Sequence, residues 1–121
     1  MIYNHYFDYT GGWPYKNFTK HEVSCKHCGE FYHDTNAMDK LQLLRDLWGR
    51  PIVINSGHRC HSHNFNVGGS PTSQHLKIAF DCAMPRAQQH EFKRLAEQAG
   101  FTGIGTYNTF IHLDTGPKRR W

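Results

Sequence analysis

Residues 73–81 read Ser73-Gln74-His75-Leu76-Lys77-Ile78-Ala79-Phe80-Asp81. Leu76, Ile78 and Phe80 alternate with other residues, which predicts a strand over 75–82. Side chains alternate between the two faces of a strand, and His75 and Asp81 are six residues apart. An unbroken strand would therefore carry both of these potential metal ligands on one face.

A second strand further along the chain offers more ligands. Residues 103–107 and 110–114 flank a short turn and are predicted to form a β-hairpin. His112 and Asp114 are two residues apart in its second strand, again on one face. If this strand lies beside the strand of Asp81, four potential ligands converge. Two histidines and one carboxylate, with a position left open for water, are the ligand pattern of catalytic zinc sites.

Two longer helices are predicted around these strands. The first begins at a capping residue, Asp34 or Thr35, and ends before Gly49. The second begins near Pro85 and ends at Gly100. The apolar stripe of the first helix consists of Met38, Leu41, Leu44 and Trp48. Together these elements predict a single α+β domain, with two main helices packed on a small, mainly antiparallel sheet.

The other segments are shorter or less regular. Residues 1–17 are predicted to be an aromatic arm that packs its rings on the body formed by 18–121. Thr19 to Glu22 fits a capping box, which predicts a short helix ending near Ser24. The β-branched run 52–54 is predicted to be a buried strand. Residues 57–74 have no apolar period and are predicted to form a long functional loop.

The composition limits the classes of protein that fit. The chain has 121 residues, a net charge of +4 and ten histidines. This length suits one domain. The positive charge favours an anionic partner, and the large number of histidines is typical of proteins that bind a metal ion. No apolar run approaches the roughly 20 residues of a membrane span. The sequence does not indicate the oligomeric state.

Four cysteines leave three interpretations open. Cys25 and Cys28 have the spacing of a zinc knuckle, but a structural zinc site needs four ligands. Cys60 or Cys82, or a histidine such as His27 or His33, could complete a second metal site. A disulfide is the second interpretation, and free thiols are the third.

Five separated motifs resemble one known family, the zinc D-alanyl-D-alanine carboxypeptidases and endopeptidases of bacteria and phages. The resemblance covers roughly residues 18–121 and is greatest to a short branch with a terminal His-x-Asp-x-Gly-Pro-x-x-x-Trp signature. The matching stretches are Ser56-Gly57-His58-Arg59, His63-Asn64 with Val67-Gly68-Gly69, Ser73 to Asp81, Gly103-Ile104-Gly105, and His112 to Trp121.

This resemblance implies a fold of the hedgehog and DD-peptidase type and a catalytic Zn²⁺ held by His75, Asp81 and His112. It implies that Arg59 binds the substrate, with Ser73 and Gln74 shaping the cleft. Asp114, two residues past the last ligand, is the expected general base. The implied reaction is hydrolysis of peptide bonds in peptidoglycan, at a cross-link or at a stem-peptide end.

The chain departs from the family pattern at one point. The family motif Ser-x-His-x-x-Gly-x-Ala-x-Asp has seven steps from His to Asp, whereas this chain has six and lacks the glycine. An inactive relative that binds wall peptides therefore stays an alternative. A second alternative is a zinc-ribbon-like module for nucleic acid, although no basic stripe interleaved with aromatic residues supports it, and nucleic acid is not the expected partner.

The implied substrate lies in the periplasmic or extracellular cell wall. The first ten residues lack the basic and apolar regions of a secretory signal. We therefore expect delivery by a phage-like particle or a lysis system.

Overall fold

The computed structural model describes residues 1–121 and is built on a five-stranded sheet in the order β3-β4-β6-β5-β7. The strands are β3 (Ile54–Ser56), β4 (Ala79–Ala83), β5 (Gly103–Thr106), β6 (Phe110–Asp114) and β7 (Arg119–Arg120). All neighbouring pairs are antiparallel except β5 and β7. The predicted hairpin is confirmed as β5 and β6, and the α+β class with a mainly antiparallel sheet is also confirmed.

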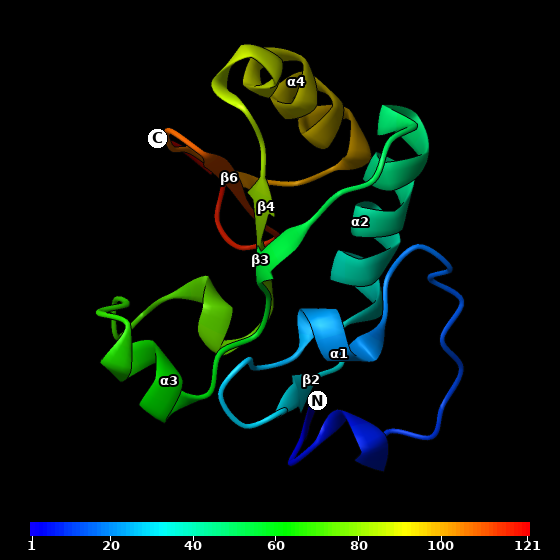
Figure 1. The fold of residues 1–121 in the computed structure, drawn as a ribbon, viewed down its shortest axis with the longest axis vertical. Helices are drawn as coiled ribbons and strands as arrows, with labels where there is room; N and C mark the ends of the chain where they lie inside the picture. The colour runs from blue at the N-terminus through cyan, green and yellow to red at the C-terminus, as the bar shows by residue number, and fades with distance from the viewer.

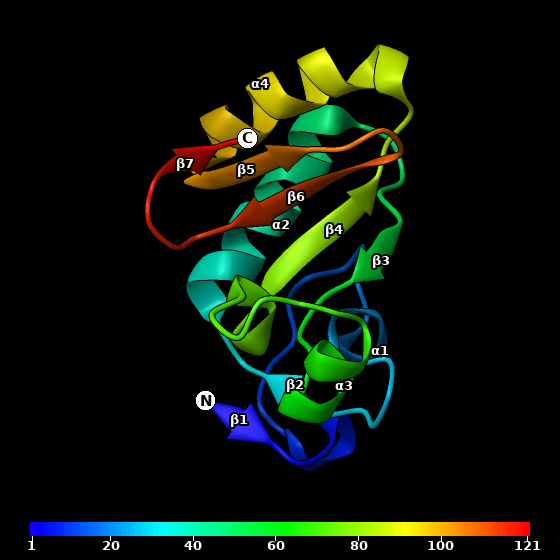
Figure 2. The same ribbon diagram turned by 90° about the vertical axis from the view of Figure 1, so that its left-hand side faces the viewer.

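Alternation along the central strands separates the two faces of this sheet. Phe80, Ile111 and Leu113 are fully buried on the face that forms the core. Asp81 and His112 are direct partners in the β4–β6 register and lie on the opposite face. Figure 1 shows α2 and α4 together on one side of the sheet, and Figure 2 views the sheet from its uncovered side. The uncovered face is therefore available for a site.

The two main helices begin and end where local chemistry dictates. The first, α2 (Thr35–Trp48), starts at Asp34, whose side chain accepts the N–H of Ala37, and it stops at Gly49 in the left-handed region (φ 71°). The second, α4 (Gln89–Ala99), follows a 3₁₀ turn, η3 (Arg86–Gln88), and stops at Gly100 with φ 107°. Neither these helices nor the shorter ones combine the length and apolarity needed to cross a membrane.

A small N-terminal layer packs against this body. Its elements are β1 (Ile2–Tyr3), η1 (Tyr6–Asp8), α1 (Lys20–Val23) and β2 (Phe31–Tyr32), and β1 pairs with β2. The capping box at Thr19 and Glu22 is confirmed, with Ser24 as the C-cap of α1. Most aromatic rings of the arm pack on the core, Tyr3, Tyr6, Tyr9 and Trp13 in part and Tyr15 as a buried residue, whereas Phe7 is exposed.

Three sequence predictions are corrected by the structure. The strand predicted over 75–82 begins only at Ala79, because Ser73 draws its neighbours into a 3₁₀ turn, η2 (Gln74–Leu76): its hydroxyl accepts the N–H of His75 and its carbonyl the N–H of Leu76. The supposed loop 57–74 contains a helix, α3 (His61–Asn66), which buries only Asn64 and so leaves no apolar period. The strand predicted over 52–54 lies two residues later, as β3.

Candidate functional site

Three side chains from separate parts of the chain meet on the uncovered face of the sheet. Asp81 and His112 come from paired positions on β4 and β6, and His75 comes from the turn η2. Asp81 Oδ1 lies 3.1 Å from His75 Nε2 and 3.1 Å from His112 Nδ1. One potential ligand atom from each residue lies within 4.8 Å of the others. The six-residue spacing therefore joins His75 to Asp81 through a turn and not through a straight strand.

The other nitrogen of each ring is already engaged as a donor. His75 Nδ1 donates to the main-chain oxygen of Gly57 at 2.6 Å, because a carbonyl can only accept. His112 Nε2 donates to Asp114 Oδ2, also at 2.6 Å. In the neutral rings, the remaining nitrogens direct lone pairs toward Asp81 Oδ1.

Three electron-pair donors that face one another need a cation between them, either protons on the rings or a metal ion. Imidazole nitrogen and carboxylate oxygen are ligands that Zn²⁺ accepts, and a hydrogen bond on the far side of each ring is typical of metal-binding histidines. The residues present therefore fit a zinc ion.

These three side chains lie at an open cleft of about 220 Å³. Its lining consists of Arg59, Ser70, Thr72, Ser73, Gln74, His75, Asp81, His112, Arg119 and Trp121. The main-chain N–H of Arg59 donates to the His75 oxygen at 2.6 Å, and its guanidinium donates to Ser73 Oγ at 3.2 Å. The structure thus brings the predicted substrate residues Arg59, Ser73 and Gln74 to the same cleft as the predicted ligands.

Asp114 has a different position from the one expected of a general base. Its side chain is fully buried and it does not line the cleft. One carboxylate oxygen accepts from His112 Nε2, and the other accepts the N–H of Gly116 at 3.0 Å. Asp114 therefore supports the ring of His112 from behind. This geometry favours a supporting role, and the assignment of Asp114 as the general base stays a prediction.

Comparison with known proteins identifies the family of this chain. A family model described as Peptidase M15 matches residues 15–114. The chain belongs to the peptidase M15 family. This confirms the predicted resemblance to zinc peptidases of peptidoglycan.

Two relatives of this M15 chain illustrate the family. The zinc D-Ala-D-Ala carboxypeptidase of Streptomyces albus G is 36% identical over 95 residues, which is 70% of this chain and 36% of the relative. The peptidoglycan L,D-endopeptidase MepK of Escherichia coli (strain K12) is 30% identical over 98 residues, which is 73% of this chain and 54% of the relative. The chain thus spans between about a third and about a half of the length of these relatives.

The electrostatics of the M15 site favour ionised carboxylates. Burial alone would raise the pKa of Asp81, but hydrogen bonds from His112 and His75 outweigh it and hold that pKa well below its ordinary value. Burial likewise opposes a lowered pKa at Asp114, yet the bonds from His112 and Gly116 lower it. Burial would lower the pKa of His112, but the Asp114 and Asp81 carboxylates raise it. The site is thus built to hold positive charge between anions.

Four residues of the cleft were not assigned a role from the sequence: Ser70, Thr72, Arg119 and Trp121. The ring of Trp121 lies 5.2 Å from that of His112, and its Nε1 donates to the Tyr107 hydroxyl at 2.8 Å. A Cβ on Gly105 would lie 2.3 Å from the Trp121 ring, so the indole occupies space that only glycine leaves free. The terminal signature ends at Trp121 and could have indicated a role for this residue. The location of Trp121 beside His112, however, depends on the pairing of β5 with β7.

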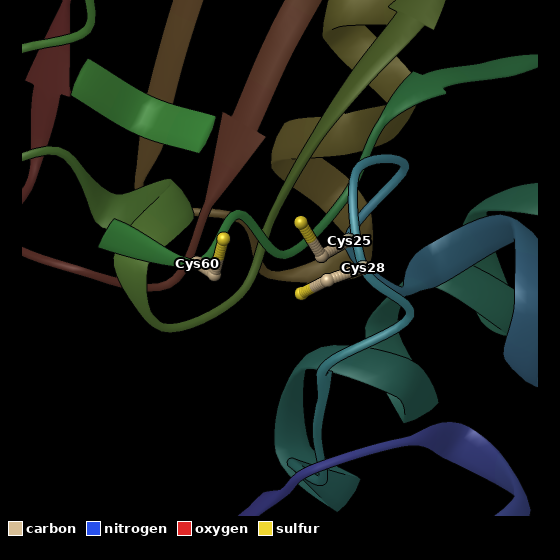
Figure 3. A group of neighbouring side chains, drawn as sticks. All are labelled: Cys25, Cys28 and Cys60. Carbon is tan, nitrogen blue, oxygen red and sulfur yellow. The ribbon is translucent and has the colours of Figure 1, made fainter. Parts of the chain in front are cut away.

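The four cysteines do not form one group. Cys82 is fully buried on the core face of β4, so its inclusion among the candidate ligands was wrong. Cys25, Cys28 and Cys60 instead come together, with one sulfur from each within 4.8 Å of the others. Figure 3 shows Cys25 and Cys28 on one loop, facing Cys60 on another. None of the three lines the cleft.

Proposed function

We propose that this M15 chain is a zinc-dependent peptidase that hydrolyses peptide bonds in peptidoglycan. The observation that carries the proposal is the meeting of His75 Nε2, Asp81 Oδ1 and His112 Nδ1 at the cleft, each with its electron pairs directed inward. The names of the relatives, a zinc carboxypeptidase and a peptidoglycan endopeptidase, support the same chemistry.

In this proposal, His75, Asp81 and His112 hold one zinc ion. When bound, the ion supplies a Lewis acid for a carbonyl group and acidifies a water molecule. Gly57 and Asp114 orient the two rings through the hydrogen bonds described above. Such supporting bonds fix both the tautomer and the direction of each ligand.

The cleft also suggests how a wall peptide binds. Arg59 and Arg119 bring two guanidinium groups to the lining, and planar guanidinium groups suit carboxylates and carbonyl oxygens. Ser73 and Gln74 add neutral donors and acceptors, and Trp121 adds an apolar wall. We propose that Arg59 anchors a carboxylate or carbonyl of the peptide beside the metal, in a substrate that lies outside the cytoplasm. Delivery by a phage-like particle or lysis system stays a prediction.

Metal analysis and muropeptide digestion of matched variants test the proposal. His75→Ala should lose the zinc of this site and all cleavage of purified muropeptides, monitored by liquid chromatography and mass spectrometry. His90→Ala, at an exposed position on α4, should keep both. Zinc held at His75 without any cleavage would instead favour a wall-peptide-binding relative that lacks activity, and cleavage by the zinc-free protein would refute the proposal.

A further inference from the structure

Three thiols form a second cluster of potential metal ligands, separate from the cleft. Cys25 and Cys28 come from the loop between α1 and β2, and Cys60 is the N-cap of α3. Their sulfur atoms lie within 4.8 Å of one another, and Figure 3 shows the two loops meeting at this point. Cys25 is buried, Cys60 is half-buried and Cys28 is exposed. The cluster therefore joins two segments that are distant in sequence and lies near the surface.

The loop of Cys25 and Cys28 forms a tight turn closed by backbone hydrogen bonds. The N–H of Gly29 donates to the Cys25 oxygen at 2.8 Å, and Gly29 has a φ of 82°, which favours glycine. The Cys25 N–H donates to the Glu30 oxygen at 2.9 Å and closes the turn. Two cysteines with this spacing on one turn can present both sulfurs to the same ion.

A backbone N–H group points at one of these sulfurs. Cys60 Sγ accepts the N–H of His63 at 3.4 Å at the start of α3. Such bonds stabilise the thiolate, which is the form that binds metal.

The two segments are also held together independently of the thiols. The His58 N–H donates to the Val23 oxygen at 2.9 Å, and His58 Nε2 lies 2.7 Å from Glu30 Oε1. A Cβ on Gly57 would lie 2.4 Å from the Val23 oxygen, so glycine is needed for this close approach. These contacts tie the segment before Cys60 to residues on both sides of the turn that carries Cys25 and Cys28. The positions of the three cysteines are therefore fixed by the fold without a metal ion.

The number of thiols favours a metal over a disulfide. One disulfide would use two of the three sulfurs and leave the third unpaired, because Cys82 is fully buried in the core and outside this cluster. A tetrahedral zinc ion uses all three and takes one more ligand. Two imidazoles are close in the chain: His27 lies between Cys25 and Cys28, and the ring of His63 stacks on that of His27 with 5.8 Å between centroids. His63 also follows Cys60 by three residues on α3.

We propose that Cys25, Cys28 and Cys60 bind a second, structural zinc ion, with the imidazole of His63 as its fourth ligand. Three thiolates and one imidazole form one of the closed ligand sets of structural zinc sites. The ion joins the N-terminal layer to the segment that carries Arg59, one residue before Cys60. This site shares no residue with the cleft, so the proposal is independent of the peptidase activity.

Zinc stoichiometry of the full chain, purified in reducing buffer, tests the proposal. Wild type should carry two zinc ions per chain, His75→Ala one, Cys60→Ser one, and the double variant none. Cys82→Ser is the matched control and should keep both. In cobalt-substituted protein, the near-ultraviolet absorption from thiolate to cobalt should be present in His75→Ala and lost in Cys60→Ser. His63→Ala should bind this second ion more weakly than His27→Ala does.

If Cys60→Ser does not fold, wild-type protein still decides the question. Stepwise addition of an organomercurial, which attacks thiolate ligands, should release one zinc ion and leave the other in place. The proposal is overturned if wild type holds no zinc beyond the ion that His75→Ala removes. It is equally overturned if mass spectrometry finds a disulfide between two of the three cysteines in the protein as isolated from its producing cells.

Discussion

Replacing Asp114 by asparagine separates a supporting residue from a general base. Asp114 uses both carboxylate oxygens as acceptors, one for His112 Nε2 at 2.6 Å and one for the Gly116 N–H at 3.0 Å. An asparagine side chain offers a single oxygen. One of the two donors must then face an amide NH₂ group inside the protein, and the ion pair with Arg119, at 3.5 Å, is lost.

The size of the effect follows from this count of acceptors. A buried donor left without a partner costs about 1–3 kcal/mol. For a domain of this size that corresponds to a loss of about 4 °C in melting temperature per kcal/mol. Loss of a residue that orients a metal ligand lowers metal affinity by about 10- to 100-fold, or about 1.4–2.8 kcal/mol. We expect both losses in Asp114→Asn, and turnover that recovers when zinc is added in excess.

Thermal unfolding and zinc competition against a chromophoric chelator measure the two quantities, and muropeptide digestion at saturating zinc measures turnover. Asp8→Asn, at an exposed position outside the cleft, is the control and should change none of them. The reasoning is refuted if Asp114→Asn keeps wild-type stability and zinc affinity but loses nearly all turnover at saturating zinc. That result would restore Asp114 to the role of general base.

Three further predictions follow from the same geometry. Gly103→Ala places a Cβ 2.0 Å from Asp114 Oδ1, so we expect a destabilisation of about 1–3 kcal/mol by chemical denaturation, whereas Gly12→Ala, which meets nothing within 4 Å, should be neutral. In chelator-treated protein, the raised pKa of His112 means that the protonated ring stabilises the folded state. This contribution to the free energy of unfolding is complete at pH values below the pKa of His112 in the unfolded chain. It is lost as the pH rises through the pKa of His112 in the folded protein. The melting temperature without zinc should therefore fall toward alkaline pH more than with zinc, which needs no proton on His112; parallel curves would contradict this. Trp121→Ala should raise KM for muropeptides while zinc content stays constant, and an unchanged KM would remove the indole from the substrate wall.

Much of the fold could be read from short stretches of the chain. The capping box at Thr19, the cap at Asp34 and the stops at Gly49 and Gly100 depend on bonds between residues a few positions apart. The hairpin of β5 and β6 is likewise local, and alternation along it places His112 and Asp114 on one face. These features depend on local bonding and periodicity, so the sequence contains all that is needed to predict them.

The residues that make up the candidate site could also be predicted in part from the sequence. The motifs named His75, Asp81 and His112 as ligands and placed Arg59, Ser73 and Gln74 near them, and the structure brings all six to one cleft. The backbone conformation that joins His75 to Asp81 was not predicted. A straight strand from His75 was expected, and the chain instead makes a 3₁₀ turn. The six-residue spacing still allows His75 to meet Asp81 and His112, because the 3₁₀ turn, and not the strand, sets the position of His75.

The remaining features depend on contacts between distant segments. Sequence spacing could not distinguish Asp114 in the cleft from Asp114 behind His112, because that depends on how Gly103 and Gly116 enclose its carboxylate. Nor could spacing select Cys60 over Cys82 as the partner of the Cys25 turn. That choice comes from burial of Cys82 on the core face of β4 and from docking of the N-terminal layer on the segment before α3. The local sequence thus specifies which side chains are available, and long-range packing selects which of them meet, because their positions depend on the whole fold and not on their separation along the chain.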